Sequence, residues 1–314
     1  MIDVRNVTFE YPAKRALFDV SCSVRAGSIT ALVGPNGAGK TTLIRCIVGL
    51  HAPLSGTVLF DGIDVHAHPR ACHRRMAYLS DFFGVYEGLS VRQCLTFTAR
   101  ACGVDRAQLR ATVRRVAEQL GIASRLGEKA GALSRGLRQR LAIAQAIVHG
   151  PAFVVMDEPA SGLDPEARGA LSALLTSLRD DGMTLLVSSH ILAELEDYCT
   201  DMIIMRDGRI VDERRLGVND AEMRRLRIDL ARPHPALAGA LLPLPHVSQL
   251  AVADDERSAT FLFSGSPDDQ HALLGALLGA GIAVIGLRED RAGLQDAYLA
   301  HLRAGNAAAR AKPQ

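Results

Sequence analysis

The chain has 314 residues, enough for about two domains, and its 48% hydrophobic and 22% charged residues are typical of a globular protein. With 36 Lys and Arg against 34 Asp and Glu, the formal net charge is only +2. Nucleic-acid-binding proteins usually carry an excess of Lys and Arg over Asp and Glu, which this chain lacks, so we expect no nucleic-acid partner. The six cysteines form neither a CxxC pair nor a regular framework, which favours a reducing, cytoplasmic compartment.

The N-terminal residues MIDVRNVTFEY alternate Val4, Val7 and Phe9 with polar residues, which predicts a strand and leaves no apolar core for a signal peptide. The most apolar run covers residues 272–287 and contains four glycines. It is shorter than the ~18 to 20 residues that a spanning helix needs. We therefore expect no targeting segment and no transmembrane helix.

From residue 1 to about 212, short apolar runs alternate with helical periods, which predicts an α/β domain built on a largely parallel sheet. Three of these runs, at residues 28–34, 153–159 and 184–190, are expected to be buried strands that end in polar residues. In such sheets, ligands bind beyond the carboxyl ends of the strands. The polar residues at these three ends are therefore the first candidates for chemistry.

The first strand end, GPNGAGKT, matches G-x-x-x-x-G-K-[ST] and precedes a helix expected at residues 40–48. Glycines let successive backbone N–H groups point at phosphate oxygens, and a helix N-terminus favours the same anion. Lys40 adds a positive charge, and the Thr41 hydroxyl is a candidate ligand for Mg²⁺. The expected phosphate-binding residues are Gly34, Pro35, Asn36, Gly37, Ala38, Gly39, Lys40 and Thr41.

The other two strand ends carry two carboxylates and a histidine. Asp157 suits a Mg²⁺ shell, and Glu158 is placed to polarise an attacking water. The alternative for this pair is a solvated strand end, but the phosphate loop upstream favours a catalytic role. For His190 the alternative is a structural histidine. Because its strand is predicted to lie beside that of Asp157, we favour a contact with a γ-phosphate.

Together with LSRGLRQ at residues 133–139, these elements closely resemble the ATP-binding subunit of ABC transporters, in order over about the first 212 residues. The resemblance implies an α/β P-loop NTPase fold with a helical subdomain, which binds ATP and Mg²⁺. It extends the phosphate loop to Thr42 and makes Asp157 a metal-side residue, Glu158 the catalytic base and His190 the switch histidine. It also implies a D-loop at residues 161–164, in which Asp164 contributes to nucleotide binding.

Upstream of the phosphate loop, Tyr11 matches the aromatic residue that stacks on adenine in this family. From the residues alone, the alternative is a strand residue that faces the core. Its position in the chain favours the stacking role.

In residues 133–139, which we call the signature loop, Ser134 and Gly136 precede a helix expected at residues 137–148. The Ser134 hydroxyl and the Gly136 N–H therefore form a second anion site at a helix N-terminus. In the family this site closes on ATP held by a second ATP-binding subunit, which implies a dimer, here expected to be a homodimer. The family's LSGGQ reads LSRGL in this chain, with Arg135 and Leu137 substituted. Because the phosphate-facing groups survive, we expect activity.

The family's glutamine that couples the nucleotide site to the membrane subunit is replaced by Asp81. A carboxylate still supplies an oxygen to Mg²⁺ or its water, so we expect Asp81 to act as the metal-side sensor. Residues 82–86, FFGVY, form an apolar stretch suited to receive a helix of a membrane partner.

Beyond the first domain, residues 213–226 are charged and are expected to be a linker. Residues 227–304 predict a small α+β domain with the βαββαβ order of a ferredoxin-like unit, and residues 305–314 a disordered tail. Some RNA-binding modules share this order, but SATFLFSG lacks their RNP pattern. The closing segment at residues 294–299 resembles the extension of ABC-2 type exporter subunits.

The function that these features imply is ATP hydrolysis by a subunit that dimerises on ATP and drives an integral membrane permease on a separate chain. We expect a peripheral protein at the cytoplasmic face of the membrane, which exports a drug-like or other small molecule. The alternative is a soluble ABC ATPase that acts on ribosomes or in DNA repair. Such proteins usually carry two cassettes or a long coiled coil, whereas this chain has one cassette and no heptad run.

Overall fold

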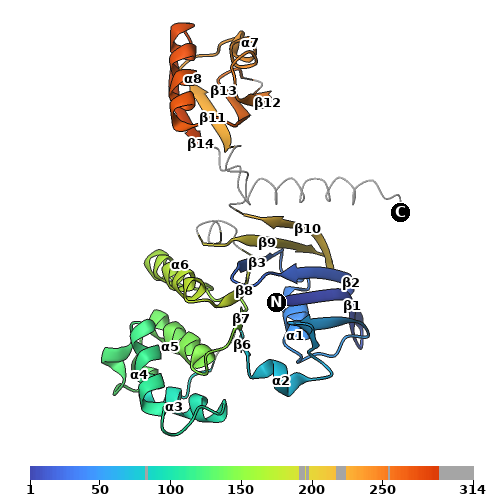
Figure 1. Cartoon of the computed structure of the whole chain (residues 1–314), viewed down its shortest axis with the longest axis vertical. Coiled ribbons are helices and arrows are strands. Elements are labelled where there is room, and N and C mark those ends of the chain that lie inside the picture. Colours follow the sequence, from blue (N-terminus) through green and yellow to red (C-terminus); the bar gives the residue numbers. More distant parts are fainter. Residues whose placement is uncertain (82–83, 191–194, 196–197, 217–223, 254, 290–314) are drawn as a thin grey trace. The chain divides into compact units, whose positions relative to one another are not determined.

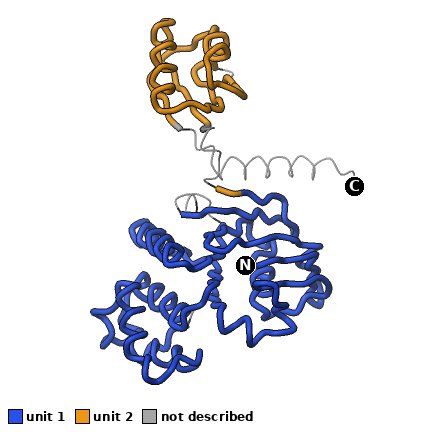
Figure 2. Tube along the Cα trace, in the orientation of Figure 1, with its two compact units in different colours: residues 1–214 blue, residues 215–314 orange. Residues whose placement is uncertain are grey.

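The computed structural model describes residues 1–314 except 82–83, 191–194, 196–197, 217–223, 254 and 290–314 (Figure 1). The chain forms two compact units, residues 1–214 and 215–314 (Figure 2), and each is described by itself. Within the described ranges, no helix has both the length and the hydropathy needed to cross a bilayer.

A six-stranded sheet in the order β10-β9-β3-β8-β7-β6 forms the centre of unit 1 (Figure 1). The pairs β9–β3, β3–β8, β8–β7 and β7–β6 are parallel. All residues of β3, β7 and β8 are buried, which is typical of parallel strands covered on both faces. The bounds are β3 Ile29–Val33, β6 Met76–Leu79, β7 Phe153–Met156, β8 Thr184–Ser189, β9 Asp201–Arg206 and β10 Arg209–Arg215.

A second sheet of unit 1 has the order β2-β1-β4-β5 and is antiparallel. Its strands are β1 Ile2–Tyr11, β2 Lys14–Val24, β4 Ser55–Phe60 and β5 Ile63–Asp64. Val4 and Val7 of β1 share one hydrophobic core with Leu43 and Ile47 of helix α1 (Lys40–Ile47) and with Leu32 of β3. This core fixes the start of α1 relative to both sheets, and with it the loop that joins β3 to α1.

The helices α3, α4 and α5 pack on one another as a group of their own, drawn in green in Figure 1. Helix α3 begins with a capping box, in which Ser90 and Gln93 bond each other's backbone N–H. Helix α5 begins at Arg135, two residues before the expected start, because the Ser134 side chain caps it. The α-helices after α1 in the described residues of unit 1 are α2 Pro69–His73, α3 Val91–Ala101, α4 Leu109–Gln119, α5 Arg135–Ile147 and α6 Pro165–Asp180.

The described part of unit 2 consists of a four-stranded antiparallel sheet in the order β12-β13-β11-β14 and two helices. Its elements are β11 Arg224–Leu230, α7 Leu237–Leu241, β12 Val247–Val252, β13 Ser258–Phe263, α8 Pro267–Gly279 and β14 Val284–Glu289. Alternate residues of β11 and β13, among them Ile228 and Phe261, join Leu273 and Leu277 of α8 in a separate core. The stretch expected to be a linker is strand at both ends, since β10 runs to Arg215 and β11 begins at Arg224. The expected helix at residues 294–302 and the tail lie outside the described residues.

Candidate functional site

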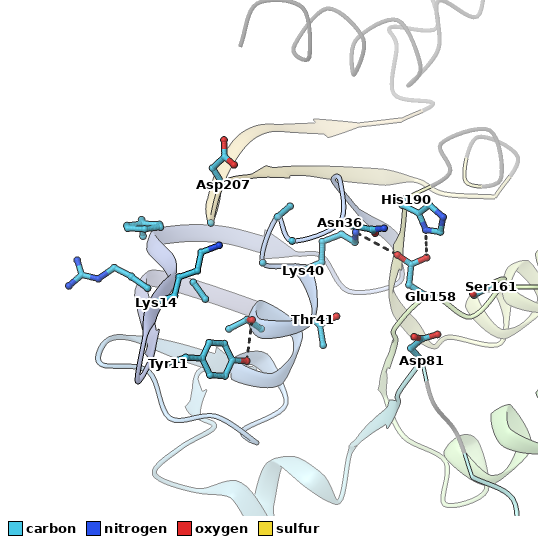
Figure 3. Close-up of a pocket in the computed structure, with 18 residues that line it drawn as sticks. Tyr11, Lys14, Asn36, Lys40, Thr41, Asp81, Glu158, Ser161, His190 and Asp207 are labelled. Atoms are coloured by element: carbon cyan, nitrogen blue, oxygen red, sulfur yellow. Dashed lines mark hydrogen bonds and ion pairs between the residues drawn. The ribbon is translucent and has the colours of Figure 1, made fainter. Parts of the chain in front are cut away.

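A cavity of about 730 Å³ opens where β3, β6, β7 and β8 end (Figure 3). This volume is within the usual range for a site that binds a small ligand. Parallel strands bring their carboxyl ends to one edge, which is why residues far apart in the sequence meet here. The expected site residues that line the cavity are Tyr11, Asn36, Gly37, Ala38, Gly39, Lys40, Thr41, Thr42, Asp81, Glu158 and His190.

The loop between β3 and α1 depends on glycines at two positions. Gly37 has φ 81° and Gly39 has φ 103°, a backbone region that favours glycine. Gly39 is the N-cap of α1 and has no side-chain cap, so the first N–H groups of this helix remain available to an anion. Gly34 and Pro35 precede this part of the loop and are not among the lining residues.

Lys40 is the first residue of α1, and its side chain is only 7% exposed. The ammonium donates a hydrogen bond to the Gly34 carbonyl at 2.7 Å, and it lies 3.6 Å from Oε1 of Glu158. The loop's own backbone therefore holds the cation in place at the wall of the cavity. A phosphate bound there meets a positive charge that has already been desolvated and oriented.

Glu158 lies between Lys40 and His190, and dashed lines join the three side chains in Figure 3. Its Oε2 is 2.8 Å from Nδ1 of His190, and its backbone has φ 49°. A non-glycine residue in this left-handed region is uncommon, and such residues cluster at active sites. The carboxylate is thus oriented by two partners and faces the same cavity as the phosphate loop.

Asp157 lies behind the cavity wall. It is 2% exposed, and its Oδ1 accepts a hydrogen bond of 2.5 Å from the hydroxyl of Ser188, which is fully buried. The same hydroxyl accepts a 2.9 Å bond from the N–H of Glu158. Ser188 therefore fixes both carboxylate residues at once.

Burial, and after it the charge of Asp157, raises the pKa of the Tyr78 hydroxyl, so Tyr78 stays neutral at physiological pH.

The oxygen donors suited to Mg²⁺ come from different elements. Thr41 and Asp81 both line the cavity, whereas Asp157 is buried next to the lining residue Glu158. Mg²⁺ prefers a hydroxyl, one or two carboxylates and several waters together with substrate phosphates. This donor set fits that preference.

Tyr11 lines the cavity and is 37% exposed, so the alternative of a core-facing strand residue is wrong. Its ring meets that of Phe9 edge-on at 5.0 Å and that of His51 edge-on at 5.9 Å. The hydroxyl lies 3.4 Å from that of Thr42. The aromatic face is thus held at the rim by its neighbours, close to the start of α1.

Ser134, Gly136 and Asp164 do not line this cavity. Ser134 caps α5, where its hydroxyl accepts a 3.4 Å bond from the N–H of Leu137. Asp164 caps α6, where its carboxylate accepts a 2.8 Å bond from the N–H of Ala167. The residues expected to form a second anion site therefore lie at another place on unit 1 than the phosphate loop.

Several lining residues are absent from the expected set, among them Lys14, Phe18 and the Asp207–Gly208 turn, while Ser161 belongs to the expected D-loop. Gly208 has φ 74°, and a Cβ there would meet the Ala16 carbonyl oxygen at 2.4 Å. An Asp-Gly pair between two extended runs is a hairpin signal, so the turn itself is readable from the sequence. Its place beside the phosphate loop is not, because that depends on the sheet order.

A glycine-rich loop before a helix, with a buried lysine, a Mg²⁺ donor set and a carboxylate held by histidine, defines a P-loop nucleotide-binding protein. Comparison with protein families narrows this class. Residues 17–161 match the family model described as ABC transporter.

Two relatives and one solved structure illustrate the similarity. Nod factor export ATP-binding protein I of Burkholderia orbicola is 35% identical over 212 residues, which cover 68% of this chain and 70% of that protein. A probable multidrug ABC transporter ATP-binding protein, YbhF of Escherichia coli, is 31% identical over 290 residues, 91% of this chain and 49% of that protein. A solved ATP-binding subunit of an ABC transporter matches with a TM-score of 0.62 and 31% identity, over 69% of this chain and 90% of that one.

The chain belongs to the ABC transporter family, as an ATP-binding protein. The expected α/β P-loop fold is confirmed for the ATP-binding part. The mutual positions of Lys40, Glu158 and His190 are the structural basis on which we assign the chemistry below.

Proposed function

We propose that this chain hydrolyses ATP and drives a separate integral membrane permease that exports a drug-like or other small molecule. The observation that carries the proposal is the alignment of Lys40, Glu158 and His190 along the wall of one nucleotide-sized cavity. The relatives' names, which include Nod factor export and multidrug transport, support the direction of transport.

In the proposed reaction, the oxygen of a water attacks the γ-phosphorus, and the bond to the bridging oxygen breaks to give ADP and inorganic phosphate. Glu158 accepts the water proton, and Lys40 and the N–H groups of the phosphate loop bind the phosphate oxygens. His190 holds the Glu158 carboxylate through its Nδ1 and contacts the γ-phosphate. Thr41 and Asp81, with the buried Asp157 behind them, would hold Mg²⁺, which would supply neutralisation of the developing negative charge.

We propose a homodimer as the active unit, because the second anion site is apart from the cavity. Ser134 and Gly136 at the start of α5, with Asp164 at the start of α6, are suited to close on nucleotide held by a second copy. The proposed location is the cytoplasmic face of the membrane, with no nucleic acid involved.

The proposed docking surface for the permease includes Tyr86 and Phe97. They are 57% and 55% exposed, and their rings meet edge-on with centroids 5.7 Å apart. An exposed pair of large aromatic rings is typical of an interaction surface. Of the apolar stretch expected at residues 82–86, Phe82 and Phe83 lie outside the described residues.

The test is to tag the full chain in its native cell, solubilise the membranes in detergent and identify what co-purifies by mass spectrometry. The proposal predicts a multi-spanning protein in near-equal amount, which the double variant Tyr86→Ser, Phe97→Ser loses. Leu242→Ser removes a similarly exposed apolar side chain in unit 2 and is expected to retain the partner. Co-purification with ribosomes or DNA-repair proteins instead would contradict the transport function.

A further inference from the structure

The departure at Arg135 places a cation at the first position of α5, directly after the capping Ser134. A positive charge in the first turn of a helix opposes the helix dipole and is unfavourable. The side chain turns to another loop, where its Nη2 donates a 2.8 Å hydrogen bond to the carbonyl oxygen of Ser161. Arg135 thus joins the signature loop to the D-loop of the same chain.

The contact between Arg135 and the D-loop is close at the next residue as well. A Cβ on Gly162 would lie 2.2 Å from Nη2 and 2.4 Å from Cζ of Arg135. Gly162 also has φ 66°, in the region that favours glycine. A side chain at residue 162 would therefore displace the guanidinium from this position.

The D-loop turn is hydrogen-bonded to the backbone of Glu158, the proposed catalytic base. The N–H of Ser161 donates to the carbonyl of Glu158 at 3.0 Å, and Ser161 itself lines the cavity. On the other side of the turn, Arg168 Nε donates to the carbonyl of Leu163 at 2.9 Å. Two guanidinium groups thus hold the carbonyls of a loop that begins three residues after Glu158.

The starts of α5 and α6 also approach each other. A Cβ on Gly136 would lie 3.7 Å from the Cβ of Ala167, an ordinary packing distance. Since Ser134 and Asp164 cap these two helices, the second anion site and the D-loop form one packed patch.

We propose that Arg135 is a positioning residue, which holds the turn at Ser161 and Gly162 and thereby sets the position of Glu158. Through this contact, the position of the turn depends on whether an anion is bound at Ser134 and Gly136. This inference rests on the proposed ATPase function, in which that site receives nucleotide from a second subunit. The substitution from the family's glycine then adds a link within the chain between the two nucleotide sites of a dimer.

The first test measures the contact without any nucleotide. Hydrogen exchange of the full chain is followed by mass spectrometry over peptides that cover residues 158–165. In Arg135→Ala the turn amides are expected to exchange about threefold to tenfold faster, because the bond is exposed and competes with water. Arg115→Ala, which removes an exposed arginine of α4, is the control and leaves these peptides unchanged. Equal exchange in wild type and Arg135→Ala overturns the inference.

The second test measures steady-state ATP hydrolysis. Arg135→Ala is expected to lower kcat about threefold to tenfold with KM for ATP unchanged, and Arg135→Lys to restore part of the loss. Gly162→Ala lowers kcat in the wild-type background and costs less in Arg135→Ala, because the clash with the guanidinium is gone. An unchanged kcat in Arg135→Ala overturns the inference. If the wild-type chain hydrolyses no ATP, the proposed function fails, while the exchange experiment still decides whether Arg135 holds the turn.

Discussion

Replacing Ser188 by alanine is expected to damage stability and catalysis together. The hydroxyl is fully buried and joins Oδ1 of Asp157, at 2.5 Å, to the N–H of Glu158, at 2.9 Å. Its removal leaves a buried carboxylate oxygen and a buried N–H without this partner. At roughly 1–3 kcal/mol for each of the two unsatisfied groups, the free energy of unfolding falls by about 2–6 kcal/mol. For a unit of this size, at roughly 2–4 °C per kcal/mol, that lowers Tm by about 4–24 °C.

The loss of activity in Ser188→Ala has a separate cause. Glu158 keeps its left-handed φ of 49° while its N–H is bonded to Ser188. Release of this bond lets the carboxylate shift, and a misplacement of 1 Å costs about 100-fold in rate. We expect kcat for ATP hydrolysis to fall by about tenfold to 100-fold at a temperature where the variant is folded.

Thermal unfolding and ATPase rates of Ser188→Ala are to be compared with those of Ser28→Ala. Ser28 is 2% exposed and donates a 2.8 Å bond to the Arg25 carbonyl at the other end of the sheet. Its loss is expected to lower Tm and leave kcat unchanged. If Ser188→Ala keeps its kcat, or Ser28→Ala loses kcat to the same degree, the proposed link between Ser188 and Glu158 is refuted.

Three further predictions concern stacking on the adenine base, the Mg²⁺ dependence of hydrolysis and the pH dependence of stability. Tyr11→Ala is expected to weaken ATP binding about fivefold to 100-fold in titration calorimetry, because stacking on a base is worth about 1–3 kcal/mol. Tyr11→Phe keeps the ring and is expected to bind ATP nearly as well as wild type. An equal loss of affinity in both variants would exclude stacking. Asp81→Asn is expected to raise the Mg²⁺ concentration needed for half-maximal ATPase rate, and an unchanged rate and Mg²⁺ dependence argues against a metal-side role. Burial lowers the pKa of His149 from its usual 6.5. Below about pH 6.5 the unfolded chain therefore binds a proton at this histidine that the folded chain does not bind. The free energy of unfolding falls as the pH drops through this range. Urea unfolding at pH 7.5 and 5.5 is expected to show a smaller difference in His149→Gln than in wild type, and an equal difference contradicts the assignment.

The sequence alone predicts those parts of the site whose conformation depends on neighbouring residues in the chain. GPNGAGKT predicted a glycine-rich loop before a helix, and six of its eight residues line the cavity, whereas Gly34 and Pro35 do not. The expected neighbour relation between the strands before Asp157 and His190 is confirmed, because β7 pairs with β8. Residues in buried, apolar, β-branched runs leave few alternatives to a central parallel strand.

The rest depends on register and packing, which a single sequence does not contain. Ser188 reaches Asp157 because Met156 pairs with Val187, so that the next residues of β7 and β8 are side by side. Nothing in the residues near Ser188 distinguishes it from its neighbour Ser189. The link from Arg135 to Ser161 likewise spans 26 residues and exists because α5 and α6 begin close together. Such contacts are products of the tertiary fold.

The most direct test of the central claim is the ATP hydrolysis rate of the purified full chain with Mg²⁺, for wild type and Glu158→Gln. Loss of a general base typically costs about 10²- to 10⁴-fold. The account predicts a fall in kcat of this size, with ATP binding retained and an ATP-dependent dimer accumulating in sedimentation. Hydrolysis by Glu158→Gln at the wild-type rate would contradict it.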